Sequence, residues 1–224
     1  RSTLFPYTTL FRSVRSRGAA SAPAATGATL ELLSRHARPS TDPTIARAVA
    51  FLRSQQRGDG SWPDVAGGQL IHGTTWAIRG LMAAGVASTD STVAAGVNWL
   101  RVQQQESGGW GEAGGSFADG GEFVAAEATA IQTAWAVLAL VDAGFADHDA
   151  TRRAIEFLVD HQHDDGTWFD LLSTERDSAA GAWYRNDLHS SAWPLLALAR
   201  WAVAIGEQSH DKMPAALRLI SDEL

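Results

Sequence analysis

The chain has 224 residues, 45% of them hydrophobic, which is enough for one sizeable core and favours a single domain or part of one. A formal net charge of −7 argues against a nucleic-acid interface, and the absence of cysteine excludes disulfides and cysteine-ligated zinc. No apolar run approaches the ~18 residues of a membrane-spanning helix, so we expect no transmembrane segment.

The first thirteen residues are not expected to belong to the native protein. Thr3–Ser13 reads TLFPYTTLFRS, the translation of a common short-read sequencing adapter. We therefore interpret residues 1–13 as an assembly artefact, which a differing DNA sequence across the junction would refute. Residues 14–25 are rich in Ala, Ser and Arg without a periodic pattern, and we predict a loop there.

From residue 26 onward, helical segments alternate with loops rich in glycine. Asp42 before Pro43 is a good helix start, because Asp accepts from free N–H groups and Pro fits the first helical position. Glycines such as Gly60 end the helices. The predicted helices are Ala28–His36, Thr44–Gln56, Thr74–Ala84, Thr92–Gln104, Ala128–Val141, Asp149–His161, Ser191–Ile205 with Pro194 in its first turn, and Pro214–Ser221.

One phrase occurs three times, and we call it the Gln-Trp phrase. The copies are FLRSQQRGDGSW from Phe51, WLRVQQQESGGW from Trp99 and FLVDHQHDDGTW from Phe157. An aromatic residue and Leu begin each copy, and Gln, Gly and Trp follow at fixed positions, which indicates stacked structural units. The shared residues are Gln56, Gly60 and Trp62; Gln104, Gly108 and Trp110; and Gln162, Gly166 and Trp168.

A second phrase, the hydroxyl-Trp phrase, alternates with the first. It has Ser or Thr, any residue and Trp, then a small residue and Leu. The copies are Thr74–Trp76 with Gly80 and Leu81, Thr133–Trp135 with Ala139 and Leu140, and Ser191–Trp193 with Ala197 and Leu198. Each unit thus reads helix, loop, helix, and no stretch alternates long enough to predict a strand. We predict an all-α fold in which the small residues let helices approach closely.

The Gln-Trp phrases are predicted to be structural. A Gln near the end of a helix can donate to the carbonyls that the helix leaves unpaired. The Trp after the Gly can lay its ring over the same helix end and bury a large apolar face. Repeat units depend on such contacts between neighbours, so we assign these residues to the scaffold rather than to chemistry.

At these phrases the chain resembles the squalene–hopene cyclase and oxidosqualene cyclase family, the class II terpene cyclases. The Gln-Trp phrases match that family's QW motif. SGGWGE from Ser107, IQTAWAVLALVDAG from Ile131 and WPLLALARW from Trp193 match as well. The resemblance covers about residues 26–205. It implies the C-terminal part of a catalytic α/α barrel, a partial (α/α)6 toroid of helical hairpins over residues 26–224.

The resemblance also implies a reaction, in which a linear isoprenoid such as squalene is protonated and cyclised to a triterpenoid. In the family a buried Asp-x-Asp-Asp motif donates the proton, and aromatic ring faces stabilise the cations. This chain contains no Asp-x-Asp-Asp, so we assign it no catalytic residue and expect it to be inactive alone. The missing N-terminal part of the same polypeptide would supply the acid. Neither a cofactor nor a metal is implied.

Two segments depart from the squalene-type cavity pattern. Residues 66–74 read AGGQLIHGT where that pattern has Trp and two Tyr, and residues 182–189 read AWYRNDLH where it is rich in Phe and Tyr. The departures favour a substrate other than squalene, or a histidine that acts as the base at the end of the reaction. The alternative for each histidine is a structural role at the start of a helix. The candidates for the substrate cavity are His72, Trp183, Tyr184 and His189.

Other polar clusters are assigned no chemistry. Asp147–Asp149 indicates a helix cap. Glu112, Asp119 and Glu122 could face a substrate, but acids in loops are usually solvated. A solvated corner is expected, rather than a metal site, at His161, His163, Asp164 and Asp165.

Two alternatives to a cyclase remain. A protein prenyltransferase β-subunit shares the toroid but binds zinc through Asp, Cys and His, and this chain lacks Cys. A non-catalytic toroid for binding would have a gene that starts near Val14 without an acid motif.

By resemblance we expect a peripheral protein on the cytoplasmic side of a membrane. Since three hairpins make about half of a ring, the isolated chain is expected to be poorly soluble or to self-associate, for instance as a homodimer.

Overall fold

The computed structural model describes residues 22–36, 40–64, 69–113, 122–170, 175–176, 183–184 and 187–206. The predictions for residues 1–21 and for Pro214–Ser221 lie outside these ranges. The helices are α1 (Pro23–Arg35), α2 (Pro43–Gln55), α3 (Leu70–Ala83), α4 (Ser91–Val102), α5 (Ala130–Asp142), α6 (Asp149–Asp160) and α7 (Asp187–Ile205). The strands are β1 (Trp110–Glu112), β2 (Ala125–Thr129), β3 (Glu175–Arg176) and β4 (Trp183–Tyr184).

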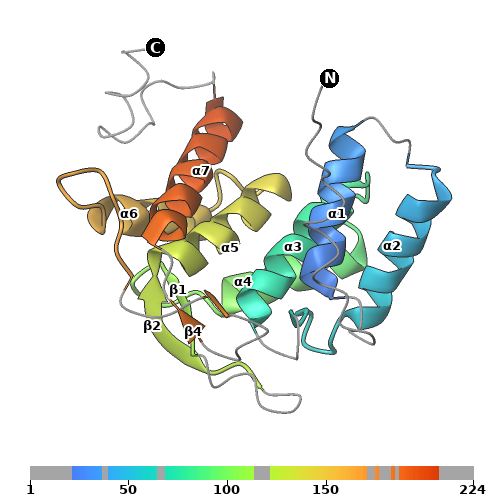
Figure 1. The fold of residues 1–224 in the computed structure, drawn as a ribbon, viewed down its shortest axis with the longest axis horizontal. Helices are drawn as coiled ribbons and strands as arrows, with labels where there is room; N and C mark the ends of the chain where they lie inside the picture. The colour runs from blue at the N-terminus through green and yellow to red at the C-terminus, as the bar shows by residue number, and fades with distance from the viewer. Residues whose placement is uncertain are drawn as a thin grey trace, which may run out of the picture.

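The helices form two rows. In Figure 1, α7, α5, α3 and α1 follow one another across the molecule, and each packs on the next. The second row packs behind the first: α2 contacts α1 and α3, α4 contacts α3 and α5, and α6 contacts α5. Alternating inner and outer helices of this kind confirm the predicted all-α toroid architecture.

The outer helices begin at side-chain caps. Asp42 Oδ1 accepts from the N–H of Thr44 at 2.7 Å, as predicted, and Asp90 caps α4 in the same way. In the Asp-His-Asp cluster the capping residue is His148, whose Nδ1 accepts from the N–H of Ala150 at 3.1 Å. A cap satisfies one of the N–H groups that a helix start leaves free, which fixes where each unit begins.

The tryptophan of each Gln-Trp phrase closes the end of an outer helix. The indole Nε1 donates to a carbonyl in the last turn: Trp62 to Leu52 at 2.6 Å, Trp110 to Leu100 at 2.7 Å and Trp168 to Leu158 at 2.7 Å. The rings are 0%, 0% and 2% exposed. The predicted scaffold role of these tryptophans is consistent with this burial, and each indole supplies a donor to a carbonyl in the last turn of its helix.

The prediction that the glutamines donate to carbonyls of their own helix is wrong for Gln56 and Gln104. Gln56 Nε2 donates to Gly60 O at 3.0 Å and to Thr92 O at 2.9 Å, in the first turn of α4. Gln104 repeats this with the carbonyls of Gly108 and Ala150. Because the indole already occupies the helix end, the amide instead joins the turn to the next unit.

The hydroxyl-Trp phrase is tied to the Gln-Trp phrase by a hydrogen bond that the sequence did not reveal. In each unit the hydroxyl accepts from the backbone N–H of the preceding tryptophan. The pairs are Trp62 with Thr74 (2.9 Å), Trp110 with Thr133 (3.0 Å) and Trp168 with Ser191 (3.2 Å). The two phrases therefore recur together because one bond locks the loop onto the inner helix.

Several sequence-based boundaries are wrong. Pro23–Ala25, predicted as loop, is the first turn of α1. Short strands occur where none was predicted: β1 pairs with β2 and β3 with β4, both antiparallel. Pro194 lies inside α7, which starts at Asp187, and not in its first turn. The strands are too short to produce an alternating pattern.

The inner helices are in close contact, as the small residues predicted. A Cβ on Gly80 of α3 would lie 2.5 Å from the Cα of Gly27 in α1. Ala139 of α5 and Ala197 of α7 are fully buried. The candidate site lies where the N-terminal halves of α3, α5 and α7 meet.

Replacing Gly108 with alanine should destabilise the chain by about 1–3 kcal/mol more than replacing Gly144, because of overpacking. Both glycines have φ of +88°, so the backbone strain is matched. A Cβ on Gly108 would lie 2.5 Å from Arg153 O of α6, whereas one on Gly144 meets nothing within 4 Å. Urea titration of both variants measures the difference, and equal losses would contradict a tight contact between units.

Candidate functional site

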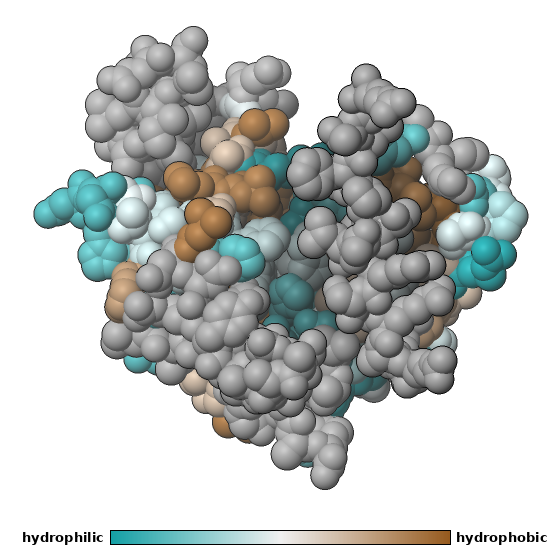
Figure 2. Space-filling model, viewed as in Figure 1, coloured by the Kyte–Doolittle hydropathy of each residue, from teal (hydrophilic) through white to brown (hydrophobic). Residues whose placement is uncertain are grey.

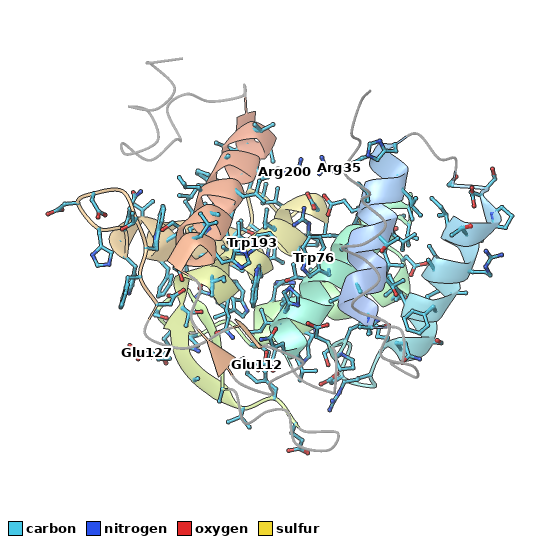
Figure 3. The ribbon with its side chains drawn as sticks, in the orientation of Figure 1. Arg35, Trp76, Glu112, Glu127, Trp193 and Arg200 are labelled. Atoms are coloured by element: carbon cyan, nitrogen blue, oxygen red, sulfur yellow. The ribbon has the colours of Figure 1, made fainter. Side chains whose placement is uncertain are left out.

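The tryptophans of the three hydroxyl-Trp phrases converge on one cluster. Ring centroids of Trp76 and Trp193 are 6.0 Å apart, and those of Trp135 and Trp193 are 6.4 Å apart, all edge to face. Figure 3 shows Trp76 on α3 and Trp193 on α7 facing the space between the helices. Trp76 and Trp193 are partly exposed, and Trp135 is buried. We did not single these rings out from the sequence, although their equal position in three repeats was the signal.

His72 belongs to the same cluster. Its ring lies 4.5 Å from that of Trp135, measured between centroids. Trp76 Nε1 donates to His72 Nε2 at 2.9 Å, and His72 Nδ1 lies 2.8 Å from Asp64 Oδ2. Since an indole N–H only donates, Nε2 carries no proton, and the proton is on Nδ1 facing Asp64. In this arrangement His72 would have to release Trp76 before accepting a proton through Nε2.

The predicted cavity residues are brought together only in part. His189 lies 6.4 Å from Trp193 between ring centroids, so both histidines border the aromatic cluster. Trp183 and Tyr184 form β4, opposite Arg176 and Glu175 of β3. The structure describes only the backbone of these two residues, and their place in the cavity stays a prediction.

Two acids bind the starts of inner helices. Glu112 accepts from the N–H groups of Leu70 and Ile71 at 2.9 and 3.0 Å, at the start of α3. Asp170 accepts from Ala130 and Ile131 at 2.8 and 3.1 Å, at the start of α5. Each acid thus anchors the inner helix of the preceding unit. We had interpreted Glu112 as a solvated loop acid, but it is 4% exposed.

Burial raises the pKa of both carboxyl groups, even though the two backbone N–H bonds at each one favour the charged form. The signal in the sequence was an acid two positions after the tryptophan in every copy. In the first copy that acid is Asp64, which holds His72. At this repeated position, Glu112 and Asp170 therefore anchor helix starts, whereas Asp64 orients a histidine.

Above the aromatic cluster lies a charged network. Arg79 is 4% exposed and donates to Asp142 and Glu31, both at 2.9 Å, and its guanidinium carbon lies 4.8 Å from the Trp76 ring centroid. Arg200 of α7 donates to the other oxygen of Asp142 at 2.6 Å. These residues line an open cavity of about 380 Å³, and Figure 2 shows the molecule hollowed between α7 and α1. The network ties α1, α3, α5 and α7 together.

The His72 tautomer can be checked directly. We expect nitrogen NMR of the full chain to show a proton on Nδ1, since Asp64 accepts and Trp76 donates. In Asp64→Ala the acceptor for Nδ1 is lost, and a mixture of tautomers should appear. A proton on Nε2 in the unsubstituted chain would contradict the described geometry.

Within the described ranges, no group of three or more His, Asp or Glu side chains could hold a metal ion. In the same ranges, no helix is long and apolar enough to cross a membrane.

The fold and the cluster define a class: α/α toroids with an aromatic inner wall. Residues 19–203 match the family model of the squalene-hopene cyclase C-terminal domain, and the chain belongs to this family.

Individual relatives agree with the family assignment. The chain is 42% identical over 161 residues to the squalene–hopene cyclase of Alicyclobacillus acidocaldarius, covering 72% of this chain and 26% of the relative. It is 35% identical over 162 residues to that of Bradyrhizobium diazoefficiens, covering 72% and 24%. It is 37% identical over 166 residues to the cycloartenol synthase of Dictyostelium discoideum, covering 70% and 22%. The chain thus spans about a quarter of the length of these relatives.

A solved structure shows the same fold. A protein from Actinoplanes superposes with a TM-score of 0.59 at 20% identity, covering 87% of this chain and 61% of that chain. At this identity the likeness concerns the fold alone.

Proposed function

We propose that this chain is the C-terminal part of a class II terpene cyclase, whose intact form cyclises squalene or another linear isoprenoid. The observation that carries the proposal is the convergence of Trp76, Trp135 and Trp193 beside His72, in a chain that belongs to the squalene-hopene cyclase C-terminal domain family. Ring faces attract cations through their quadrupole, so such a wall suits a carbocation that moves along a chain.

The described residues suggest separate roles. Trp76 and Trp193, both partly exposed, would offer ring faces to the substrate, while buried Trp135 would support them. Asp64 fixes the His72 ring. His189, at the start of α7, also borders the ring cluster and is a second candidate for accepting the final proton. This chain would supply the aromatic wall of the cavity and the histidine that accepts the proton. The acid that donates the first proton would come from upstream sequence.

The test joins the chain to its upstream sequence and incubates the intact protein with squalene and with shorter isoprenoids. We expect cyclic products, and none from residues 14–224 alone. Replacing Trp76 with leucine should lower kcat by at least about tenfold, since a desolvated cation–π contact is worth about 2 kcal/mol. An exposed leucine far from the cluster, Leu32→Ala, is the control. No product from any isoprenoid would overturn the proposal in favour of a binding toroid.

We further propose that this half ring needs a cover. α7 exposes Leu188, Leu195, Leu196 and Val203, at 74%, 46%, 41% and 79%. Apolar residues of α7 border the hollow in Figure 2. Apolar patches of this kind are usually covered by protein or lipid. The missing N-terminal part, a second copy in a homodimer, or a membrane surface at the cytoplasmic side would cover them. Self-association of the isolated chain in size-exclusion chromatography, lost in the intact protein, would favour the first.

A further inference from the structure

Trp76 is held by polar side chains on its edge and on one face. Its Nε1 donates to His72 Nε2 at 2.9 Å, and the guanidinium carbon of Arg79 lies over the ring, 4.8 Å from its centroid. Both partners belong to α3, four residues before and three residues after Trp76. Residues three and four apart share a face of a helix, so the three side chains form one row along α3.

Arg79 is itself fixed by acids from two other inner helices. Its Nε donates to Asp142 of α5 and its Nη2 donates to Glu31 of α1, both at 2.9 Å. The arginine is 4% exposed, and a planar guanidinium that is bonded at two of its nitrogens has little freedom to turn. The packing of α1, α3 and α5 therefore sets which face of Trp76 the guanidinium covers.

The charge of Arg79 is compensated close to the ring. The side chains of Asp142 and Glu31 are only 12% and 13% exposed. Arg200 and Arg35 bind the same two carboxylates, and Figure 3 shows both arginines in the space between α7 and α1. Their side chains are 40% and 58% exposed, so solvent screens their charges. The buried cation is thus matched by two largely buried anions.

This compensation has a consequence if a second cation forms at the same ring. An uncompensated arginine on one face of a ring repels a positive charge on the other. A cation in contact with the opposite face of Trp76 lies roughly 9 Å from the guanidinium carbon. At an effective dielectric constant of about 20, two unit charges at this distance repel enough to slow a reaction step by roughly twentyfold.

We propose that Arg79 is a positioning residue for the cyclisation, and that Asp142 and Glu31 keep its charge from opposing the reaction. This inference rests on the proposed function, since it requires a carbocation at the aromatic wall. Arg79 covers one face of Trp76 and holds the ring so that the other face meets the substrate. Because the isoprenoid is neutral until it is protonated, the charge of the network acts on the cationic transition state and hardly on substrate binding.

Hydrogen exchange of the Trp76 indole, followed by NMR of the full chain, tests the positioning. Arg79→Met replaces the planar fork by an unbranched apolar side chain and leaves each carboxylate with its other arginine partner. The indole N–H should then exchange with solvent at least about tenfold faster, because its bond to His72 opens more often. Arg152→Met, at an exposed arginine of α6 that also binds aspartates, is the control. Equal exchange in the two variants would overturn the proposal.

Steady-state kinetics of the intact protein test the charge compensation. Asp142→Asn keeps the shape and one acceptor oxygen but removes a negative charge. We expect kcat to fall at least about tenfold while KM changes by less than about twofold. Asp147→Asn, at an exposed aspartate that binds Arg152, changes the charge of the chain equally and should leave kcat unchanged. A rise in KM without a fall in kcat, or equal kcat in the two variants, would show that the charge plays no such part.

A double variant separates this effect from a loss of structure. In Arg79→Met with Asp142→Asn there is no buried cation left to compensate, so kcat should be no lower than in Arg79→Met alone. A further fall in the double variant would mean that Asp142 acts through the fold and not through Arg79.

Failure of this inference differs from failure of the proposed function. If the unsubstituted intact protein forms no product from any isoprenoid, the proposed function fails, and the exchange comparison alone decides whether Arg79 positions Trp76. If product forms but the matched variants behave alike, the proposed function stands and the role given to Arg79 is wrong.

Discussion

Replacing Trp110 with alanine is expected to lower the free energy of unfolding by about 3–5 kcal/mol, the cost of deleting a fully buried aromatic side chain. The ring is 0% exposed, and its Nε1 donates to Leu100 O at 2.7 Å. Its backbone N–H, which donates to Thr133, is kept in the alanine variant, so the loss reports on the side chain. Urea titration followed by circular dichroism, at one fixed protein concentration, measures the loss.

Two further variants separate the contributions. Trp110→Phe keeps most of the ring and loses the donor, so we expect a smaller loss of about 1–2 kcal/mol. Thr133→Val removes the acceptor for the backbone N–H while keeping the shape of the side chain. If Trp110→Ala lost less than Trp110→Phe, or if neither variant lost stability, the phrase would not be the clasp that holds each unit.

Replacing Glu112 with alanine should cost about 2–6 kcal/mol, because it leaves two buried N–H groups without an acceptor at about 1–3 kcal/mol each. Those donors are Leu70 and Ile71 at the start of α3. Glu106→Ala, at an exposed residue of the preceding turn, is the control and should cost little. Urea titration of the two variants makes the comparison, and equal losses would contradict the anchoring role.

The same carboxyl group gives a pH dependence whose sign follows from its raised pKa. A group whose pKa is higher in the folded than in the unfolded chain contributes stability that is complete below its unfolded pKa and is lost as pH rises through its folded pKa. The stability difference between the unsubstituted chain and Glu112→Gln should therefore shrink as the pH rises from about 4, the ordinary pKa of a glutamate, through the raised pKa of Glu112. A difference that grows over this range would mean that the N–H bonds outweigh burial.

The repeated architecture was predictable because short sequence patterns, such as helix caps, glycines and the two phrases, recur in each unit. Asp42 before Pro43 predicted the start of α2 to within a residue, and the glycines ended helices where expected. The two repeated phrases led to the correct family from the sequence alone. Helix starts without a side-chain cap were harder: α3 starts at Leu70, four residues before the predicted start, because Glu112 from a distant loop holds it.

Contacts between units were not predictable from the sequence. Gln56 reaches a carbonyl 36 residues away, and Gln104 reaches one 46 residues away, so no local pattern encodes either bond. The same holds for Glu112, which looks like any loop acid until α3 is placed above it. At the site, the sequence predicted His72 and His189 as cavity candidates but placed the tryptophans of the hydroxyl-Trp phrases only in the repeats, since their convergence depends on how the inner helices pack.

Sequencing the source DNA upstream of the Val14 codon tests the central claim most directly. We expect the reading frame to continue through further Gln-Trp phrases and through an Asp-x-Asp-Asp motif, which would supply the proton donor for the wall formed by Trp76, Trp135 and Trp193. A start codon close to Val14, with no such motif before it, would contradict the account and make a toroid for binding the better description.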